Sequence, residues 1–126
     1  MIVADSSYIV EGLLNKVELI KEHDQIVTSE LAIFEVANAL WKRERIFKDL
    51  DDGLPYLSIF YGWLETSKIL LVGSGHGLLQ DSLLIARRNA VSPYDAVFVA
   101  LALRTGLRLM TFDQKQSAVM RKESRR

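Results

Sequence analysis

The hydrophobic positions along the chain alternate between short continuous runs and longer stretches with helical spacing. Four short apolar runs predict buried strands, namely Ile2–Asp5, Ile26–Val27, Ile69–Val72 and Leu107–Thr111. The stretches around these runs predict helices, namely Tyr8–Leu14, Val17–Glu22, the long segment opened by Thr28–Ser29, Tyr56–Glu65, Leu78–Ala90, Ser92–Arg104 and the tail from Gln114. Strands that alternate with helices indicate an α/β fold, in which a central parallel sheet lies between two layers of helices.

The long helix after the second strand has a pronounced amphipathic pattern. Its apolar positions keep the i, i+3, i+4 spacing of one helical face, so we expect that face to point into the core. These positions are Leu31, Phe34, Ala37 (or Asn38) and Trp41. Glu35 lies close to this stripe rather than on the charged face. In the short helix that precedes it along the chain, Val17 and Ile20 are expected to point inward.

Length and composition narrow the class of protein. The chain has 126 residues, of which 49% are apolar, and this suits one domain, residues 1–126, with a genuine core. It has no cysteine, which excludes disulfides and thiolate metal sites and fits a reducing cytoplasm. We expect neither a membrane span nor a signal peptide. Basic and acidic residues number 16 each, and this balance argues against a protein that coats nucleic acid non-specifically.

Four acidic residues fall where such a fold could gather them. Asp5 and Asp113 follow the first and last predicted strands, and the carboxyl ends of parallel strands share the sheet edge where α/β proteins place their ligand sites. Asp95 opens the helix before the last strand and Glu35 lies in the helix after the second, so both need helices that lean inward. Taken singly, each acid has an ordinary explanation, as a helix cap, a capping box with Ser92, a turn residue or a partner of a basic side chain.

Convergence of these carboxylates would make the edge a cation site. Two carboxylates about 4 Å apart repel each other by roughly 4 kcal/mol at an effective dielectric of about 20, so the group must take up protons or a cation. Oxygen ligands without cysteine or a suitable histidine favour hard ions such as Mg²⁺ or Mn²⁺. Such an ion binds phosphate oxygens and activates water, which points to hydrolysis of phosphodiester bonds.

Four motifs in this order resemble those of the PIN-domain ribonucleases and, within them, the small VapC-like toxins of prokaryotic toxin–antitoxin pairs. The motifs are Val3–Ser7, Ser29 with Glu35–Leu40, Ser92–Ala102 and Leu109–Asp113. Each motif alone is weak, but together they cover nearly the whole chain in the order and spacing of the family. The resemblance implies a PIN-like three-layer fold whose sheet has four strands, or five where a short strand follows the last acid.

The resemblance also implies an activity and assigns roles to individual residues. By similarity, Asp5, Glu35, Asp95 and Asp113 would bind Mg²⁺ or Mn²⁺ and act in catalysis. Ser6 (or Ser7), Asn38 and Thr111 would be supporting polar groups. Members of this class cut RNA, commonly form homodimers and are silenced by a cognate antitoxin protein.

Binding of RNA would need basic residues near the acids. The candidates are Lys42, Arg43 and Arg45, where the long helix ends, and Lys115. For any single one of them, a solvated helix face is the ordinary explanation. Aromatic side chains could stack on bases, but their helical spacing favours packing; they are Trp41, Tyr56, Phe60, Tyr61 and Trp63. We expect an antitoxin segment in the groove between the early helices and Tyr56–Glu65, from which an arginine could reach the acids.

Three other classes of protein are possible on the same pattern. A phosphoacceptor receiver domain needs paired acids after the first strand and an aspartate after the third, but Asp5 stands alone and Val72 is followed by Gly73–Ser74. A haloacid-dehalogenase-like phosphatase needs Asp-x-Asp, which Asp5–Ser7 lacks. A catalytically silent PIN-like module that binds RNA or protein remains the main alternative, and the presence of all four acids favours the nuclease.

Overall fold

The computed structural model describes residues 1–126 and contains one parallel sheet. Its strands are β1 (Ile2–Ala4), β2 (Ile26–Ser29), β3 (Ile69–Val72) and β4 (Leu109–Met110). Their order across the sheet is β3-β2-β1-β4, so the N-terminal strand lies in the interior of the sheet. All neighbouring strands pair in parallel, with Val3 opposite Val27 on one side and Leu109 on the other. The predicted parallel sheet is confirmed, with four strands and no fifth.

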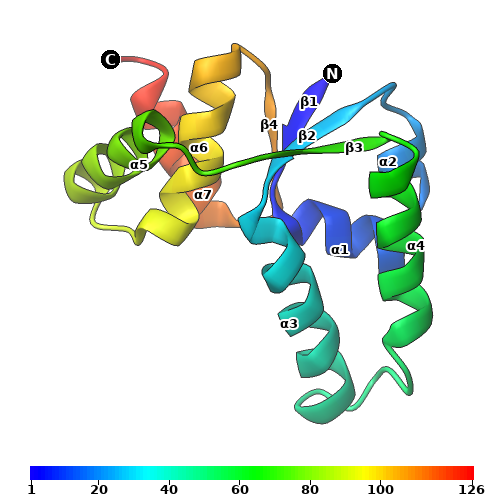
Figure 1. Ribbon diagram of the computed structural model, residues 1–126. Coiled ribbons are helices and arrows are strands. Elements are labelled where there is room, and N and C mark those ends of the chain that lie inside the picture. Colours follow the sequence, from blue (N-terminus) through cyan, green and yellow to red (C-terminus); the bar gives the residue numbers. More distant parts are fainter.

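Seven helices surround the sheet. They are α1 (Ser6–Leu14), α2 (Glu18–Lys21), α3 (Leu31–Arg45), α4 (Leu54–Glu65), α5 (His76–Asn89), α6 (Pro93–Thr105) and α7 (Gln114–Glu123). Figure 1 shows α5, α6 and α7 on one side of the sheet and α1, α2 and α4 on the other, while α3 extends away from the carboxyl ends of the strands. This arrangement is the predicted three-layer α/β/α fold. None of the helices has the length and apolar character needed to span a bilayer.

Two elements form the centre of the core. The three residues of β1 are all buried, because strands flank β1 on both edges and helices cover both faces. Helix α6 is buried continuously from Ala96 to Ala102, since it packs against α5, α7 and three of the strands. Gly106, with a φ of 70°, ends this helix as predicted, because a left-handed residue closes the last turn most readily without a side chain.

The predicted inward face of α3 is wrong. Phe34 and Trp41 are 76% and 51% exposed, whereas the buried residues of this helix are Ala32, Val36 and Leu40. Both sets satisfy helical spacing, and the sequence pattern favours the larger side chains. The packing of α3 against α1 accounts for which set is buried, and the Oγ of Ser29, the last residue of β2, accepts a hydrogen bond from the N–H of Leu31 at the start of the helix.

Four smaller predictions about the boundaries and burial of the elements are wrong. Thr28 and Ser29 do not open α3 but lie fully buried in β2. Val17 is 37% exposed, because it precedes α2, and Ile20 alone points inward. Strand β3 is not fully buried: it is the edge strand, and Leu71 is 38% exposed. The last strand is shorter than predicted.

Candidate active site

Asp5 lies at the carboxyl end of β1 with a side chain that is almost fully buried. It is the N-cap of α1, and its Oδ1 accepts hydrogen bonds from the N–H of Tyr8 at 3.1 Å and from the Oγ of Ser7 at 2.7 Å. Its Oδ2 accepts a 2.6 Å hydrogen bond from the Oγ1 of Thr111, which follows β4. Three donors from two strand ends therefore fix this carboxylate in one orientation.

The hydroxyl of Ser6 forms a hydrogen bond that links Glu35 to the same edge of the sheet. The Oγ of Ser6, the first residue of α1, donates a 3.0 Å hydrogen bond to Oε1 of Glu35. Glu35 is half-buried, one turn into α3, so this bond joins α3 to the end of β1. Ser6 thus supports Glu35, whereas Ser7 supports Asp5, and the two serines after β1 have separate partners.

The two remaining acids, Asp113 and Asp95, both contact Lys115, one through its backbone N–H and the other through its side chain. Asp113 is the N-cap of α7, and its Oδ1 accepts from the N–H groups of Lys115 and Gln116 at 2.8 and 3.3 Å. Asp95 is in the first turn of α6, where Ser92 Oγ accepts from its N–H at 3.3 Å. The Nζ of Lys115 lies 3.5 Å from Oδ2 of Asp95, so this basic side chain partly neutralises Asp95.

The hydroxyls of Ser7 and Thr111 connect the ends of β1 and β4. Besides their bonds to Asp5, the two Oγ atoms lie 3.4 Å apart. Ser7 Oγ accepts from the N–H of Phe112 at 2.9 Å, and Thr111 Oγ1 accepts from the N–H of Asp113 at 2.9 Å. The position of Asp113 is therefore coupled to that of Asp5 through Thr111. The sequence motif named Thr111 but left the choice between Ser6 and Ser7 open.

Asp5 and Glu35 are held in conditions that disfavour their negative charge. Burial raises the pKa of Asp5, and the hydrogen bonds from Thr111 and Ser7 offset part of that rise. Burial is also the main cause that raises the pKa of Glu35, and repulsion from Asp5, Asp95 and Asp113 adds to it. Glu35 thus lies within electrostatic range of the three other carboxylates, and Asp5 lies within range of Asp113. Such a cluster favours a proton or a cation among its members.

The donor set fits a hard divalent ion, although the side chains are not closed around one. All candidate ligands are carboxylate oxygens, which Mg²⁺ and Mn²⁺ prefer. As the side chains stand, no three His, Cys, Asp or Glu residues are gathered closely enough to enclose an ion. Asp113 has one oxygen engaged in its helix cap, and Asp95 has one near Lys115. Binding of an ion would require these side chains to turn toward Asp5 and Glu35.

The predicted basic and polar residues divide into two groups. Lys42 and Asn38 line a hollow beside Glu35, and Lys115 lies against Asp95. Arg43 instead pairs with Asp49 at 2.7 Å where α3 ends, and Arg45 lines a different hollow. The structure therefore brings Lys42, Lys115 and Asn38 to the acids and leaves the two arginines away from them.

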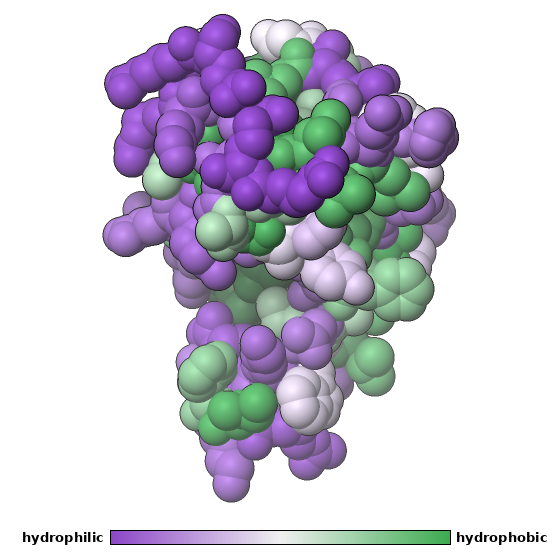
Figure 2. All heavy atoms as spheres, turned by 90° about the vertical axis from the view of Figure 1, so that its left-hand side faces the viewer, coloured by the Kyte–Doolittle hydropathy of each residue, from purple (hydrophilic) through white to green (hydrophobic).

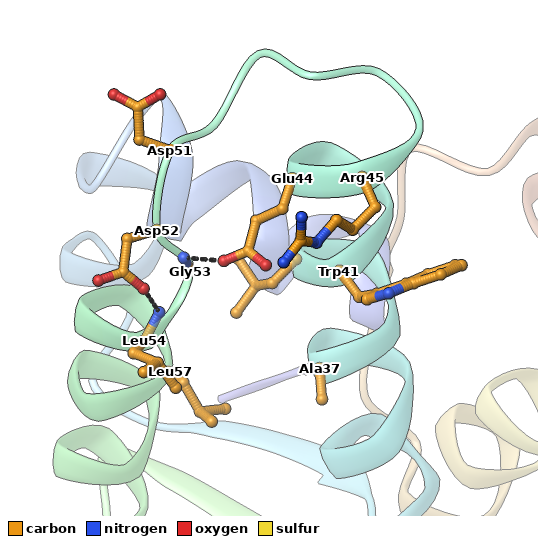
Figure 3. Close-up of a pocket in the computed structure, with 10 residues that line it drawn as sticks. Ala37, Trp41, Glu44, Arg45, Asp51, Asp52, Gly53, Leu54 and Leu57 are labelled. Carbon is orange, nitrogen blue, oxygen red and sulfur yellow. Dashed lines mark hydrogen bonds between the residues drawn. The ribbon is translucent and has the colours of Figure 1, made fainter.

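The hollow that Arg45 lines is a pocket of about 430 Å³ between α3 and the start of α4 (Figure 3). Its walls combine apolar side chains with three acids, namely Ala37, Leu40, Trp41, Leu54 and Leu57 with Glu44, Asp51 and Asp52. Figure 3 shows Glu44 accepting from the N–H of Gly53 and Asp52 accepting from that of Leu54. This pocket lies in the region where the sequence predicted a groove for a protein partner.

Known proteins share the fold and part of the sequence of this chain. The model of the PIN domain family matches residues 2–122. Ribonuclease VapC3 of Pyrobaculum aerophilum is 34% identical over 98 residues, which cover 76% of this chain and 72% of that protein. Among solved structures, the Mycobacterium tuberculosis toxin VapC20, which cleaves the sarcin–ricin loop, superposes with a TM-score of 0.71 at 14% identity, covering 94% of both chains.

A toxin–antitoxin complex from Klebsiella pneumoniae also has this fold, with a TM-score of 0.67 at 13% identity over 94% of this chain and 91% of that one. The structural likenesses establish the arrangement of strands and helices. The family match spans nearly all residues and includes every element that carries an acid of the site. The chain belongs to the PIN domain family, and its curated relative places it among the VapC-like members.

Proposed function

We propose that this protein is a metal-dependent endoribonuclease and the toxin of a type II toxin–antitoxin system. The observation that carries the proposal is the buried Asp5 carboxylate, held by Ser7, Tyr8 and Thr111, together with Glu35, which lies within electrostatic range of Asp5, Asp95 and Asp113. A buried carboxylate with a raised pKa in a group of like charges is typical of a functional site. The name of the VapC3 relative supports RNA as the substrate.

In the proposed reaction, Asp5, Glu35, Asp95 and Asp113 hold Mg²⁺ or Mn²⁺, and the bound ion supplies Lewis acidity and a water of lowered pKa. The chain itself supplies orientation. Thr111 and Ser7 keep both oxygens of Asp5 in place, and Ser6 keeps Glu35 turned toward the same edge. Lys115 and Lys42 bring positive charge to an otherwise acidic edge, so that a phosphate of the RNA backbone can approach.

We further propose that an antitoxin protein occupies the pocket between α3 and α4. The Klebsiella pneumoniae neighbour is a toxin–antitoxin complex, which supports a partner of this kind. Three acids and exposed Trp41 at this pocket fit a segment with basic and apolar side chains. We also propose a homodimer, because α5 leaves Leu79 and Leu83 about half exposed, and exposed apolar patches mark protein contacts. The proposed location of the protein is the cytoplasm.

A catalytically silent RNA-binding or protein-binding module of the same fold is the second candidate. Two observations favour it: Asp95 already has a cationic neighbour in Lys115, and the acids do not enclose an ion as they stand. Under this alternative, Lys115 occupies the place that a metal ion would take. The two candidates differ in whether RNA is cut.

The test is incubation of the purified protein, freed of any antitoxin, with a structured RNA pool and Mg²⁺ or Mn²⁺. We expect cleavage that is lost with EDTA and in Asp5→Asn, and retained in Asp24→Asn, a control at an exposed acid away from the site. Binding of Mn²⁺ is measured in parallel by calorimetry. A folded protein that neither cuts RNA nor binds Mn²⁺ would exclude the nuclease and favour the silent module.

A further inference from the structure

Two aromatic side chains are left exposed directly beside the acids. Phe34 on α3 is 76% exposed and Tyr94 on α6 is 65% exposed. Neither helix needs them for its own packing, because α3 buries Ala32, Val36 and Leu40, and α6 buries the run from Ala96. Single exposed rings are common on protein surfaces, but two that border the same hollow beside a site form an apolar patch of the kind that marks ligand contacts.

These two rings line one hollow that is continuous with the acid site. The hollow has a volume of about 400 Å³ and is also lined by Ser6 and Glu35, which are joined by the 3.0 Å hydrogen bond of the site. A volume of this size lies within the range of about 300–1,000 Å³ that is typical of small-ligand sites. Whatever occupies the hollow is therefore adjacent to Glu35.

The polar groups of the hollow suit a nucleotide. Lys42 lines it and takes part in no ion pair of the structure, and the side chain of Asn38 makes no hydrogen bond within the protein. A free ammonium group can contact a phosphate, and a free amide can pair with the edge of a base. Glu35 is the only acid of this hollow, whereas the pocket between α3 and α4 has three. The charges thus favour RNA here and disfavour it there.

The shape of the surface agrees with an extended ligand. Figure 2 shows a narrower part of the molecule below the main body, at the end to which α3 extends in Figure 1. Hydrophobic side chains lie among hydrophilic ones on this part, and a recess separates it from the main body. An RNA chain that crosses from the main body to α3 would pass the carboxyl ends of the parallel β-strands. A double helix presents its bases only at their edges, so a ring can stack on a base only where the base is unpaired.

We propose that Phe34 and Tyr94 form a stacking platform that holds an unpaired base of single-stranded RNA next to the acids, with Lys42 on a neighbouring phosphate. The proposal rests on the proposed function and deepens it by naming the two residues that contact the base. Stacking on aromatic side chains is tolerant of sequence, because every base has a π face. The platform therefore selects unpaired regions of RNA, while sequence preference arises elsewhere, for example at Asn38.

The test measures binding without cleavage. An Asp5→Asn background is titrated with a short single-stranded RNA that contains 2-aminopurine, a base whose fluorescence falls when it stacks. We expect quenching on binding, about tenfold weaker affinity in Phe34→Leu and Tyr94→Leu, and retained quenching in Phe34→Trp. Phe47→Leu is the matched control, because Phe47 is 63% exposed at the end of α3 but lies outside the hollow. Fully paired RNA of the same sequence is expected to bind without quenching.

The outcomes separate this proposal from the proposed function. If the parent protein cuts RNA while both leucine variants bind and cut like the parent, the platform is wrong and the nuclease stands. If no metal-dependent cleavage is found but quenching is lost in the leucine variants, the platform stands without the nuclease. Unchanged RNA affinity together with weakened binding of an antitoxin segment would assign the hollow to the protein partner and overturn the proposal. A folded parent that binds no RNA would overturn it as well.

Discussion

The hydroxyl of Thr111 orients Asp5, the most buried acid of the molecule. Thr111 Oγ1 donates to Asp5 Oδ2 at 2.6 Å and accepts from the N–H of Asp113 at 2.9 Å, so it fixes the distance between two acids of the site. A hydrogen bond to the charged form of a carboxylate favours that form, and the bond from Thr111 is the largest cause that lowers the pKa of Asp5 against the effect of burial.

Replacing this hydroxyl by a methyl group isolates its effect. Thr111→Val is expected to lower the kcat of RNA cleavage by about 10–100-fold, the range for supporting residues of metal sites. The pKa of Asp5 is expected to rise further, because a bond to its charged form is lost, so the acidic limb of the pH–rate profile moves to higher pH. Thr66→Val, at an exposed helix end, is the control. An unshifted profile would show that Thr111 does not act through Asp5.

The protonation of Glu35 changes the free energy of unfolding of the protein. Because its pKa is raised in the folded protein, the folded state holds the proton more tightly than the unfolded chain does. The resulting stabilisation is present below the ordinary pKa of glutamate and is lost as pH rises through the raised value. In the absence of metal, ionised Glu35 therefore disfavours folding near neutral pH.

Glu35→Gln is expected to unfold at a higher denaturant concentration than the parent at pH 7.5 in EDTA, and the difference is expected to disappear toward pH 4. Glutamine keeps an acceptor for the Oγ of Ser6, so packing is little changed. Urea titrations at a series of pH values measure the effect. The exposed Glu65→Gln serves as the control, and an equal response of both variants would contradict the assignment.

At the scale of elements, α1 and α2 approach each other closely at Gly12. A Cβ on Gly12 would lie 2.5 Å from Cγ1 of Ile20, and Ile20 is fully buried, so neither side can retreat. Helix α1 carries Ser6 and Ser7 at its start, and its position against α2 therefore helps to fix the supports of both Asp5 and Glu35. The glycine acts as a spacer for the site although it lies a full two turns from the acids.

Gly12→Ala is expected to lower the free energy of unfolding by about 1–3 kcal/mol, the usual cost of overpacking a core. Gly62→Ala is the matched comparison, because Gly62 is also within a helix but a Cβ there meets nothing within 4 Å. That variant is expected to gain about 0.5–1 kcal/mol from helix propensity. Denaturant unfolding of both proteins measures the difference, and equal stabilities would show that Ile20 has room to move.

The order of the elements could be predicted from the sequence more reliably than their rotation. Continuous apolar runs and the turn at Gly106 located the strands and the helix end, because these signals are local. The inward face of α3 could not be predicted, since Phe34 and Trp41, seven residues apart, fit one helical face as well as Val36 and Leu40, four residues apart, fit another. The choice depends on which face meets α1, and that contact is long-range. The same error concealed Phe34 as an exposed ring.

At the scale of the whole molecule, the site gathers acids from segments spread along nearly the full sequence. The placement of Asp5 and Asp113 at strand ends made the common edge predictable, while the link of Asp95 to Lys115 depends on the packing of α6 against α7 and was not predictable. The catalytic roles of the four acids remain predictions. Because the acids repel one another in the folded state and separate on unfolding, a cation that binds them should stabilise the entire fold.

Addition of Mn²⁺ at about 100 times its Kd is expected to raise the free energy of unfolding by about 2.7 kcal/mol, and EDTA should remove the gain. Asp5→Asn is expected to abolish the metal-dependent increase, whereas the exposed Asp24→Asn should preserve it. Thermal unfolding with and without Mn²⁺ measures both effects. An increase that survives in Asp5→Asn would place the ion elsewhere on the molecule.

The bond between Thr111 and Asp5 joins residues that are 106 positions apart in the sequence. During synthesis the first acid leaves the ribosome long before the threonine that orients it, and β1 also waits for β4 as its neighbour on one side. An incomplete chain therefore carries Asp5 and Glu35 without the support that gives them their geometry. The geometry around Asp5 can therefore be complete only when nearly the whole chain has emerged.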